Sequence, residues 1–214
     1  MDYLERGNSY FKRWRALIKF INDNNEGPYV QFKQKYNDAI NENQKNIEAI
    51  NISSYSSMLN EVNSRFVNLK YVDNKDFIFF SNYESPKAQD FTNHNQISAL
   101  IFWNSINVQI RLKAIIKKTT KEFNNNYFQN RSKQKNALAI SSNQSEPIKS
   151  FESVINNFNN ALNNDDLQKC PNYWGGYSFT PYYFEFWEGH KSRLNKRNVY
   201  QIKENGWKQS IIQP

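Results

Sequence analysis

Trp174-Gly175-Gly176-Tyr177 opens the most informative part of this sequence, which continues through Glu185-Phe186-Trp187-Glu188-Gly189 to Arg193-Leu194-Asn195-Lys196-Arg197. Two glycines beside aromatic residues indicate a backbone that turns tightly or lets another surface approach closely. Two arginines four residues apart, just after an aromatic strand, are typical of fixed donors to a phosphate or a carboxylate. An aromatic-rich hairpin with solvated surface arginines is the alternative interpretation of this segment alone.

The composition of the whole chain indicates one folded domain with excess positive charge. A chain of 214 residues with 38% hydrophobic residues has enough apolar side chains for a core. The formal net charge of +8 suits an anionic partner, although an AT-rich coding sequence would also produce abundant lysine. No nucleic-acid motif accompanies the charge, so we expect no nucleic-acid partner and a smaller phosphorylated ligand instead.

The sequence also bears on where the protein works. No segment approaches the roughly 18 consecutive apolar residues of a membrane span, and the N-terminus lacks the apolar region of a signal peptide. The lone Cys170 leaves no intramolecular disulfide, which fits a reducing compartment. We therefore expect a cytoplasmic protein without membrane contact.

Helical spacing and capping signals predict helices in five places. These are residues 8–23, Pro28 to about Ile40, Ser85-Pro86 to about Asn93, a Thr119–Glu122 capping box to about Asn130, and Phe151 to Leu162. The first is basic and amphipathic, and we expect it to pack on its own domain or a partner subunit rather than on a membrane.

Runs of β-branched and aromatic residues predict strands through the rest of the chain. They are expected near 47–52, 62–72, 77–80, 96–103, 106–118, 176–188 and 198–204, with a final strand from Trp207. Asp73-Asn74-Lys75 predicts a turn, and Asn205-Gly206 is a strong hairpin signal. Residues 131–149 are polar and are expected to form a loop. The pattern predicts an α+β fold with an antiparallel barrel at its centre.

The usual motifs of metal sites and of hydrolases are missing. His94 and His190 are the only histidines, and neither lies at ligand spacing from Cys170 or from a pair of carboxylates. The sequence has no G-x-S-x-G, no P-loop and no G-x-G-x-x-G. We expect no metal, and chemistry supplied by a cofactor on a cationic, aromatic surface.

The middle of the chain offers such a surface. Arg65 and Lys70 flank one strand, and Ser81 and Lys87 follow the next strand beside a predicted helix N-terminus. A hydroxyl, an ammonium and free main-chain N–H groups at that helix end converge well on a phosphate. Taken singly, each of these residues also fits ordinary solvated surface.

Several motifs follow one another in a distinctive order. They are R-x-V-x-L-K, then F-F-S-N-Y-E-S-x-K, Q-I-R, Q-S, W-G-G-Y, E-F-W-x-G and R-L-x-x-R. This order resembles the pyridoxamine 5′-phosphate oxidase family from about Pro28 to Pro214. The resemblance implies a homodimeric split β-barrel with FMN bound at the subunit interface, and a division into an N-terminal helical extension (1–27) and a flavin-binding domain with a C-terminal dimerisation region (28–214).

The resemblance also implies an activity and its residues. Family members oxidise pyridoxamine or pyridoxine 5′-phosphate to pyridoxal 5′-phosphate, and oxygen reoxidises the flavin. Positions that match the FMN set are Arg65, Lys70, Ser81, Lys87, Gln109, Gln144, Ser145, Trp187 and Arg197. Positions that match the substrate set are Lys70, Tyr127, Arg131, Lys135, Arg193 and Asn195, of which Arg193 and Asn195 stand at the catalytic positions.

Some positions depart from the family pattern. Pro86 stands where an arginine is usual, and Lys135 stands where a serine is usual. Residues 137–140 replace an I-G-A-W stretch, and R-L-H-D-R has become Arg193-Leu194-Asn195-Lys196-Arg197. Asn195 forms hydrogen bonds but does not titrate near neutrality as histidine does. We therefore expect an oxidase with reduced turnover, and two alternatives stay open: a related split-barrel flavoenzyme with another reduced substrate, and a non-catalytic flavin or pyridoxal-phosphate binding protein.

Overall fold

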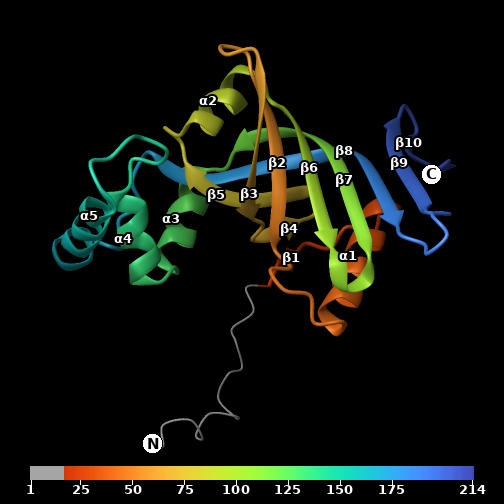
Figure 1. The fold of residues 1–214 in the computed structure, drawn as a ribbon, viewed down its shortest axis with the longest axis horizontal. Coiled ribbons are helices and arrows are strands. Elements are labelled where there is room, and N and C mark those ends of the chain that lie inside the picture. The colour runs from red at the N-terminus through yellow and green to blue at the C-terminus, as the bar shows by residue number, and fades with distance from the viewer. Residues whose placement is uncertain (1–16) are drawn as a thin grey trace, which may run out of the picture.

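The computed structural model describes residues 17–214, which fold around one ten-stranded sheet (Figure 1). Its strands are β1 (Lys19–Ile21), β2 (Ala49–Ser56), β3 (Glu61–Asn68), β4 (Tyr71–Asp73), β5 (Asp76–Asn82), β6 (Gln96–Trp103), β7 (Val108–Lys118), β8 (Trp174–Glu188), β9 (Lys196–Lys203) and β10 (Gly206–Ile212). The helices are α1 (Gly27–Asn41), α2 (Pro86–Asn93), α3 (Lys121–Gln129), α4 (Lys133–Ser141) and α5 (Phe151–Asn164), with a short 3-10 helix η1 (Asn104–Ile106).

The sheet runs in the order β1-β4-β5-β8-β7-β6-β2-β3, and β9 joins β8 and β10 beside this path. Apart from the parallel β1–β4 pair, the described strand pairs are antiparallel. The long β8 pairs with β7 on one edge, and on the other edge with β5 through its first half and β9 through its second half. The register shifts between Lys113 and Ala114 of β7, opposite a bulge in β8 in which Tyr182 is the extra residue. The strands thus form the barrel. The long β8 connects its two parts, because it pairs with β5 in its first half and with β9 in its second half.

Helix α1 closes one side of the barrel with its aromatic face. Phe32 packs edge-on against Phe77 with ring centroids 5.0 Å apart, and Tyr29 does the same against Phe184 at 5.2 Å. Pro28 occupies the first turn, where its missing N–H costs no helical hydrogen bond. The core that results is one continuous cluster of buried side chains reaching from α1 to β8.

The other helices gather at the opposite side of the molecule. Figure 1 shows α3, α4 and α5 together at the end of the sheet where β8 begins, while β9 and β10 project at the far end. Helix α3 packs on β8, and α4 packs on α5. Two regions that carry predicted site residues, α3–α4 and β9, are therefore separated by the length of the sheet.

Most of the predicted elements are confirmed. The helices α1, α2 and α5 and the strands β5 to β9 lie where the sequence predicts them, within a few residues. The Asn205-Gly206 turn joins β9 to β10, and Gly206 adopts a φ of 102°, a conformation that favours glycine. The predicted α+β class with a central barrel is also confirmed.

Four predictions are wrong in part. Of the helix expected over residues 8–23, residues 8–16 lie outside the described part of the chain, and Lys19–Ile21 form a strand paired with β4 instead. Helix α3 is capped by the Thr120 hydroxyl, which accepts from the Phe123 N–H, whereas Thr119 donates to Asn124. The strand expected over 62–72 is divided into β3 and β4 around Leu69 and Lys70.

The loop expected at 131–149 contains a helix, α4. The Ser132 hydroxyl caps it by accepting from the Lys135 N–H. The helix lacks an apolar stripe because one of its two buried side chains is polar: Asn136 donates to the carbonyls of Phe128 and Leu167 at 2.8 Å each. Because the buried amide of Asn136 holds this helix in place, its sequence shows no helical repeat of apolar residues that would predict it.

Candidate active site

A cavity of about 580 Å³ lies between β3, β5, the start of α2, and helices α3 and α4. Its basic lining residues are Arg65, Lys70, Lys87, Arg131 and Lys135, and no carboxylate is among the lining residues. The rest of the wall consists of Phe66, Val67, Asn68, Phe80, Ser81, Pro86, Tyr127, Gln144, Ser145 and Trp174. A concave site with several cations and no acid attracts a ligand with more than one negative charge.

Lys87 marks one end of the cavity. Its buried ammonium donates to three uncharged oxygens: Ser85 Oγ at 3.0 Å, Gln144 Oε1 at 3.0 Å and Ser81 Oγ at 3.2 Å. Burial, and then the nearby charge of Arg65, lower the pKa of Lys87 to about 8. A buried cation held by neutral acceptors is electrostatically unsatisfied, and an anion placed beside it would gain a charge-assisted hydrogen bond.

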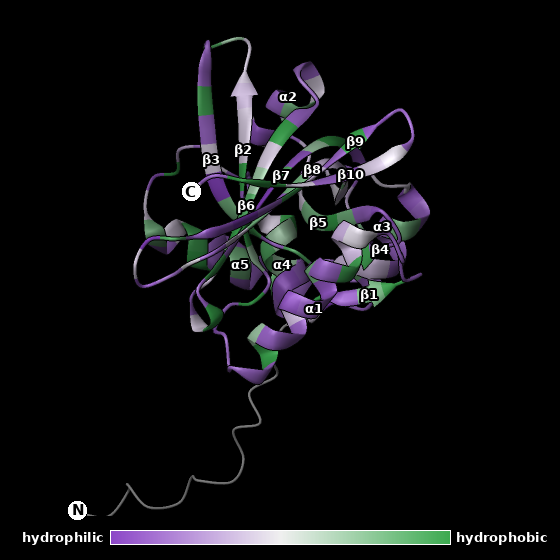
Figure 2. Ribbon diagram, turned by 90° about the vertical axis from the view of Figure 1, so that its right-hand side faces the viewer, coloured by the Kyte–Doolittle hydropathy of each residue, from purple (hydrophilic) through white to green (hydrophobic). Residues whose placement is uncertain are grey.

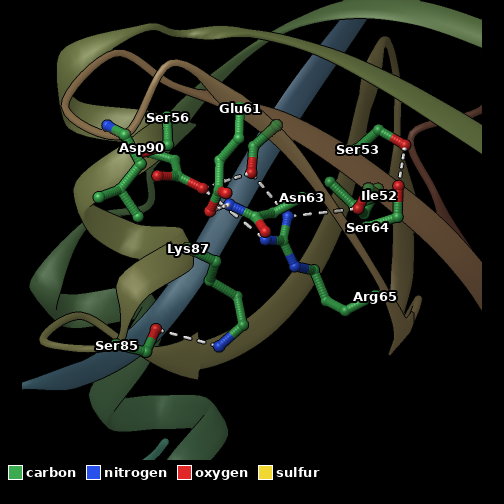
Figure 3. Close-up of polar contacts among 12 residues, drawn as sticks. Ile52, Ser53, Ser56, Glu61, Asn63, Ser64, Arg65, Ser85, Lys87 and Asp90 are labelled. Carbon is green, nitrogen blue, oxygen red and sulfur yellow. Dashed lines mark hydrogen bonds and ion pairs between the residues drawn. The ribbon is translucent and has the colours of Figure 1, made fainter.

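Arg65 lies beside Lys87 at this end, as Figure 3 shows. Its Nη1 donates to Ser54 Oγ at 2.7 Å and to the Ile52 carbonyl at 3.3 Å, and its Nη2 lies 3.7 Å from Oδ2 of Asp90. Burial lowers the pKa of Arg65, and the Asp90 carboxylate opposes that shift. Ser54, Ile52 and Asp90 thus hold the guanidinium in place, and Arg65 also lines the cavity.

The other end of the cavity combines cations with stacked rings. The Phe80 and Tyr127 rings are parallel with centroids 3.6 Å apart, and Trp174 stacks on Phe80 at 5.3 Å. The Arg131 guanidinium lies 4.3 Å from the Trp174 ring centroid, a cation–π contact. Burial lowers the pKa of Lys70, and its neighbours Lys135 and Arg131 add to the shift against the opposing effect of Glu48. This end thus combines three basic side chains with a planar aromatic wall, an arrangement that suits a second anionic group.

The structure therefore brings together most of the residues that the sequence predicts. The cavity is lined by Arg65, Lys70, Ser81, Lys87, Tyr127, Arg131, Lys135, Gln144 and Ser145. Pro86 also lines it, so the position without a cation faces the same space.

The remaining predicted residues lie elsewhere. Gln109, Trp187 and Arg197 are cross-strand neighbours on β7, β8 and β9. Arg193 and Asn195 occupy the connection between β8 and β9, where the Asn195 Oδ1 accepts from the His190 N–H at 3.0 Å. None of these five lines the cavity. One chain thus holds two separate groups of predicted site residues.

The glycines at the start of β8 are explained by close packing. A Cβ on Gly176 would lie 2.5 Å from the Thr119 hydroxyl oxygen, and one on Gly175 would collide with the Tyr83 hydroxyl and the Asn124 amide. The Tyr83 hydroxyl donates to the Gly176 carbonyl at 2.9 Å. The sequence left two explanations for these glycines, a tight turn or the close approach of another surface, and the second is confirmed. This close packing positions α3 and Trp174 next to the cavity.

Sequence reasoning missed the aromatic wall and the groups behind Arg65. Phe80 and Trp174 lie inside recognised motifs, but nothing in the motifs shows that their side chains stack. Asp90 lies three residues after Lys87 on α2, and this helical spacing was the available signal that both face the same way.

Other candidate sites are weaker in the described part of the chain. Among residues 17–214 no three His, Cys, Asp or Glu side chains are grouped as a metal site would need. Cys170 is partly buried, and burial raises the pKa of its thiol, which opposes thiolate chemistry. No helix among these residues is both long enough and apolar enough to span a membrane.

The chain is similar in sequence to known proteins. The family model described as the pyridoxine 5′-phosphate oxidase C-terminal dimerisation region matches residues 174–214. The chain is 32% identical to pyridoxine/pyridoxamine 5′-phosphate oxidase 1 of Hydrogenovibrio crunogenus over 87% of this chain and 88% of that protein. It is 34% identical to the corresponding oxidase of Cytophaga hutchinsonii over 82% of this chain and 83% of that protein.

Two solved structures share the fold. One is PhzG from Burkholderia lata 383 in complex with tetrahydrophenazine-1-carboxylic acid, with a TM-score of 0.83, 23% identity, and coverage of 87% of this chain and 92% of that chain. The other is a pyridoxamine 5′-phosphate oxidase-related, FMN binding protein from Nostoc punctiforme, with a TM-score of 0.71, 12% identity, and coverage of 88% and 98%.

Proposed function

This chain belongs to the pyridoxine/pyridoxamine 5′-phosphate oxidase family, and on that premise we propose that it oxidises pyridoxamine or pyridoxine 5′-phosphate to pyridoxal 5′-phosphate. Its fold is the split barrel of FMN-binding proteins of this kind, and the family cofactor is FMN. The observation that carries the proposal is one cavity with cations at both ends and stacked aromatic rings at the second of them.

The lining of the cavity fits FMN. Lys87 and Arg65 supply a buried ammonium and a fixed guanidinium at one end, where they would hold the FMN phosphate. Ser81, Gln144 and Ser145 offer hydroxyl and amide groups beside them. When bound, FMN supplies the two-electron acceptor, and molecular oxygen takes the electrons on to give hydrogen peroxide.

The chain's own residues would hold the substrate at the other end. Lys70, Arg131 and Lys135 present three cations to the substrate phosphate, and the Tyr127 hydroxyl lies at the same wall. The oxidation removes two electrons and two protons from an amine or alcohol carbon. The alcohol becomes the aldehyde directly, whereas the imine from the amine is hydrolysed by water to the aldehyde and ammonia. No nucleophile is needed, because the main task of the protein is to stack the two rings at reacting distance.

We further propose that the active protein is a homodimer in which each site uses both chains. Gln109, Trp187, Arg193, Asn195 and Arg197 lie outside the cavity of their own chain, and β9 projects from the far end of the sheet. A second copy that brings these residues to the cavity would complete the predicted FMN and substrate sets. The matched C-terminal region is described as a dimerisation region, which supports this arrangement.

An exposed apolar surface on the β2–β3 hairpin also supports a dimer. Val62 and Phe66 are 69% and 73% exposed, and Met58 and Leu59 are exposed at the tip. In Figure 2 β3 carries green hydrophobic bands on an otherwise purple strand. Phe66 lines the cavity, so a partner that covers it would also close the site.

The test of the oxidase function is anaerobic flavin bleaching in a single turnover. The FMN-loaded protein is mixed with excess pyridoxamine 5′-phosphate, and we expect loss of the oxidised flavin absorbance at a reduced rate. Unphosphorylated pyridoxamine is the matched control, since it lacks the group that the cations hold. Bound FMN that stays oxidised with the phosphorylated substrate, in the natural protein and in the Asn195→His variant, would overturn the oxidase proposal.

A related flavoenzyme with another reduced anionic substrate is the second candidate. Lys135 favours it, because a third cation at the substrate end also suits a carboxylated heterocycle. Bleaching by such a compound, with none by pyridoxamine 5′-phosphate, would select this candidate. FMN that binds but accepts electrons from neither compound would leave a flavin-binding protein.

We also propose a cytoplasmic location and keep the division of the chain at residue 27 as a proposal. The lone Cys170 supports a reducing compartment. Because Lys19–Ile21 pair with β4, part of the N-terminal segment contributes to the sheet. Deleting residues 1–16 while retaining β1 would show whether the preceding segment is needed for folding or for flavin binding.

A further inference from the structure

Three side chains from three elements are linked behind the Lys87 end of the cavity. Arg65 Nη1 on β3 donates to Ser54 Oγ on β2 at 2.7 Å, and the Ser54 hydroxyl donates to Asp90 Oδ2 on α2, also at 2.7 Å. The carboxylate oxygen that accepts from Ser54 also lies 3.7 Å from Arg65 Nη2. Figure 3 shows the Arg65 and Asp90 side chains pointing toward one another, with Lys87 next to them.

This linkage is largely shielded from solvent. Ser54 is 1% exposed and Asp90 is 6% exposed, whereas the Arg65 side chain still lines the cavity. A buried carboxylate is costly unless hydrogen bonds and a cation satisfy it. Here the Ser54 hydroxyl and the Arg65 guanidinium supply both, so each member of the linkage restricts the orientation of the next.

Helix α2 joins this linkage to Lys87. Asp90 follows Lys87 by three residues, so both side chains leave the same face of the helix. The carboxylate ties that face to β2 and β3, and the ammonium reaches Ser81 on β5 and Gln144. The spacing between the two cations is thereby set by Asp90 and Ser54 together.

We propose that Asp90 is a positioning residue of the cavity: acting through the Ser54 hydroxyl, its carboxylate fixes the Arg65 guanidinium beside the Lys87 ammonium so that one phosphate group meets both cations. The identity of the phosphate as that of FMN rests on the proposed function, while the linkage itself rests on the contacts above.

The charge of Asp90 has a separate effect that can be measured. The charged group that acts on Lys87 is Arg65 from β3, and the Asp90 carboxylate lies 3.7 Å from that guanidinium, whereas the contacts of Lys87 from β5 and from the segment after α4, Ser81 and Gln144, are neutral. Burial, and then the Arg65 charge, together lower the pKa of Lys87 to about 8. Without the Asp90 carboxylate the Arg65 charge is unopposed, and Lys87 loses its proton at lower pH.

The first experiment titrates Lys87 by NMR in the full-length protein, with Lys87→Arg to identify its signal. Asp90→Asn keeps the shape and can still accept from Ser54, but it removes the charge. We expect its Lys87 pKa to fall by about half a unit or more, whereas Ser54→Ala retains the carboxylate and leaves the Lys87 pKa nearly unchanged. An unchanged Lys87 pKa in Asp90→Asn would overturn the electrostatic role of Asp90.

The second experiment measures FMN dissociation constants at pH 7 by flavin fluorescence. Asp90→Ala and Ser54→Ala each break the linkage, and we expect each to weaken FMN by about three- to tenfold. Asp90→Asn keeps the hydrogen bond from Ser54, and we expect its FMN dissociation constant to stay within about twofold of that of the natural protein. We expect the double variant Ser54→Ala/Asp90→Ala to bind FMN no more weakly than either single variant, because both substitutions break the same linkage.

Riboflavin, which lacks the phosphate, binds all of these variants equally if the linkage acts on the phosphate. FMN affinities that are unchanged in both Ser54→Ala and Asp90→Ala would overturn the positioning role. A natural protein that binds no FMN would refute the proposed function instead, and the Lys87 titration would still decide whether Asp90 controls this end of the cavity.

Discussion

Arg197 and Glu185 form the most tightly connected ion pair of the C-terminal half: Arg197 Nε and Nη2 lie 2.8 and 2.7 Å from Oε1 of Glu185. The other oxygen, Oε2, accepts from Arg111 Nη1 and from the Tyr183 hydroxyl, both at 3.0 Å. Glu185 is 1% exposed. A carboxylate saturated in this way orients Arg197 before any ligand arrives.

Glu185→Gln should therefore destabilise the protein and loosen Arg197. An amide cannot balance two guanidinium groups, and we expect a loss of about 1–3 kcal/mol in the free energy of unfolding, since both arginines are partly solvated. Urea denaturation measures the loss. Glu188→Gln is the matched control, because Glu188 pairs with Lys35 at a partly exposed position. Equal stability of the two variants would contradict a special role for Glu185.

Arg65→Ala should weaken FMN binding by at least about tenfold, because a charge-assisted hydrogen bond is worth roughly 1.5–3 kcal/mol. Pro86 offers no substitute cation at this end of the cavity. Fluorescence titration with FMN measures the change, and Lys33→Ala serves as the control because Lys33 pairs with Asp23 on the exposed surface. An unchanged dissociation constant would remove Arg65 from the flavin site.

The affinity for FMN should fall as the pH rises through about 8, the pKa of Lys87, because the neutral amine no longer attracts phosphate. The fall is at most about tenfold per pH unit. Lys87→Arg keeps its charge and should bind with little pH dependence between pH 7 and 9.5. A natural protein with the same flat profile would show that Lys87 does not contact the phosphate.

The same shift predicts a trend in the stability of the ligand-free protein. The folded-state pKa of Lys87 is about 8, below the ordinary value of 10.5, so between these values the unfolded chain binds more protons. The contribution of Lys87 to the free energy of unfolding is thus unfavourable below pH 8 and improves as the pH rises toward 10.5. Comparing urea midpoints of the natural protein and Lys87→Met across this range isolates the effect.

Asn195→His should raise the rate of flavin bleaching by pyridoxamine 5′-phosphate, because histidine donates to the substrate and titrates near neutrality. A histidine Nδ1 can still accept from the His190 N–H, so the turn is retained. Arg193→Ala should lower the rate below that of the natural protein. Single-turnover kinetics measure both rates. Equal rates in all three proteins would show that Arg193 and Asn195 take no part in the reaction.

A mixed dimer tests whether the two groups of residues meet between chains. Arg65→Ala and Arg193→Ala change different groups, so each homodimer has no intact site. Random assortment of the two chains restores about a quarter of the sites, since half of the dimers are mixed and each has one intact site. The amplitude of the bleaching phase that has the rate of the natural protein measures the fraction. No recovery on co-expression, with dimers confirmed by sedimentation, would contradict shared sites.

Much of this architecture could be predicted from the sequence because it depends on local signals. The period of apolar residues marks α1 and β5–β8, and Asn205-Gly206 marks the last hairpin, since in each case neighbouring residues determine the conformation. The members of the cavity were predicted through the order of motifs, and Arg65, Lys87, Tyr127 and Arg131 do converge there.

What could not be predicted depends on contacts between distant segments. Lys19–Ile21 are helical by pattern, but β4 offers an open edge, and pairing with it outweighs local preference. Helix α4 rests on a buried amide, which has no hydrophobic period. Ser54 and Asp90 look like ordinary polar residues until β2 and α2 come together. The separation of Arg197 from the cavity likewise follows from the path of β8 alone.

The path of β8 has a mechanical consequence. This single strand of 15 residues spans about 45–50 Å, and it is hydrogen-bonded on both edges in its first and second halves, with the bulge at Tyr182 between them. It carries Trp174 at one end and Trp187 at the other. In the proposed dimer each β8 would have one end in its own site and the other end in its neighbour's. The two sites would then be connected by one continuous strand, with the bulge at Tyr182 as the place along it where the strand can bend.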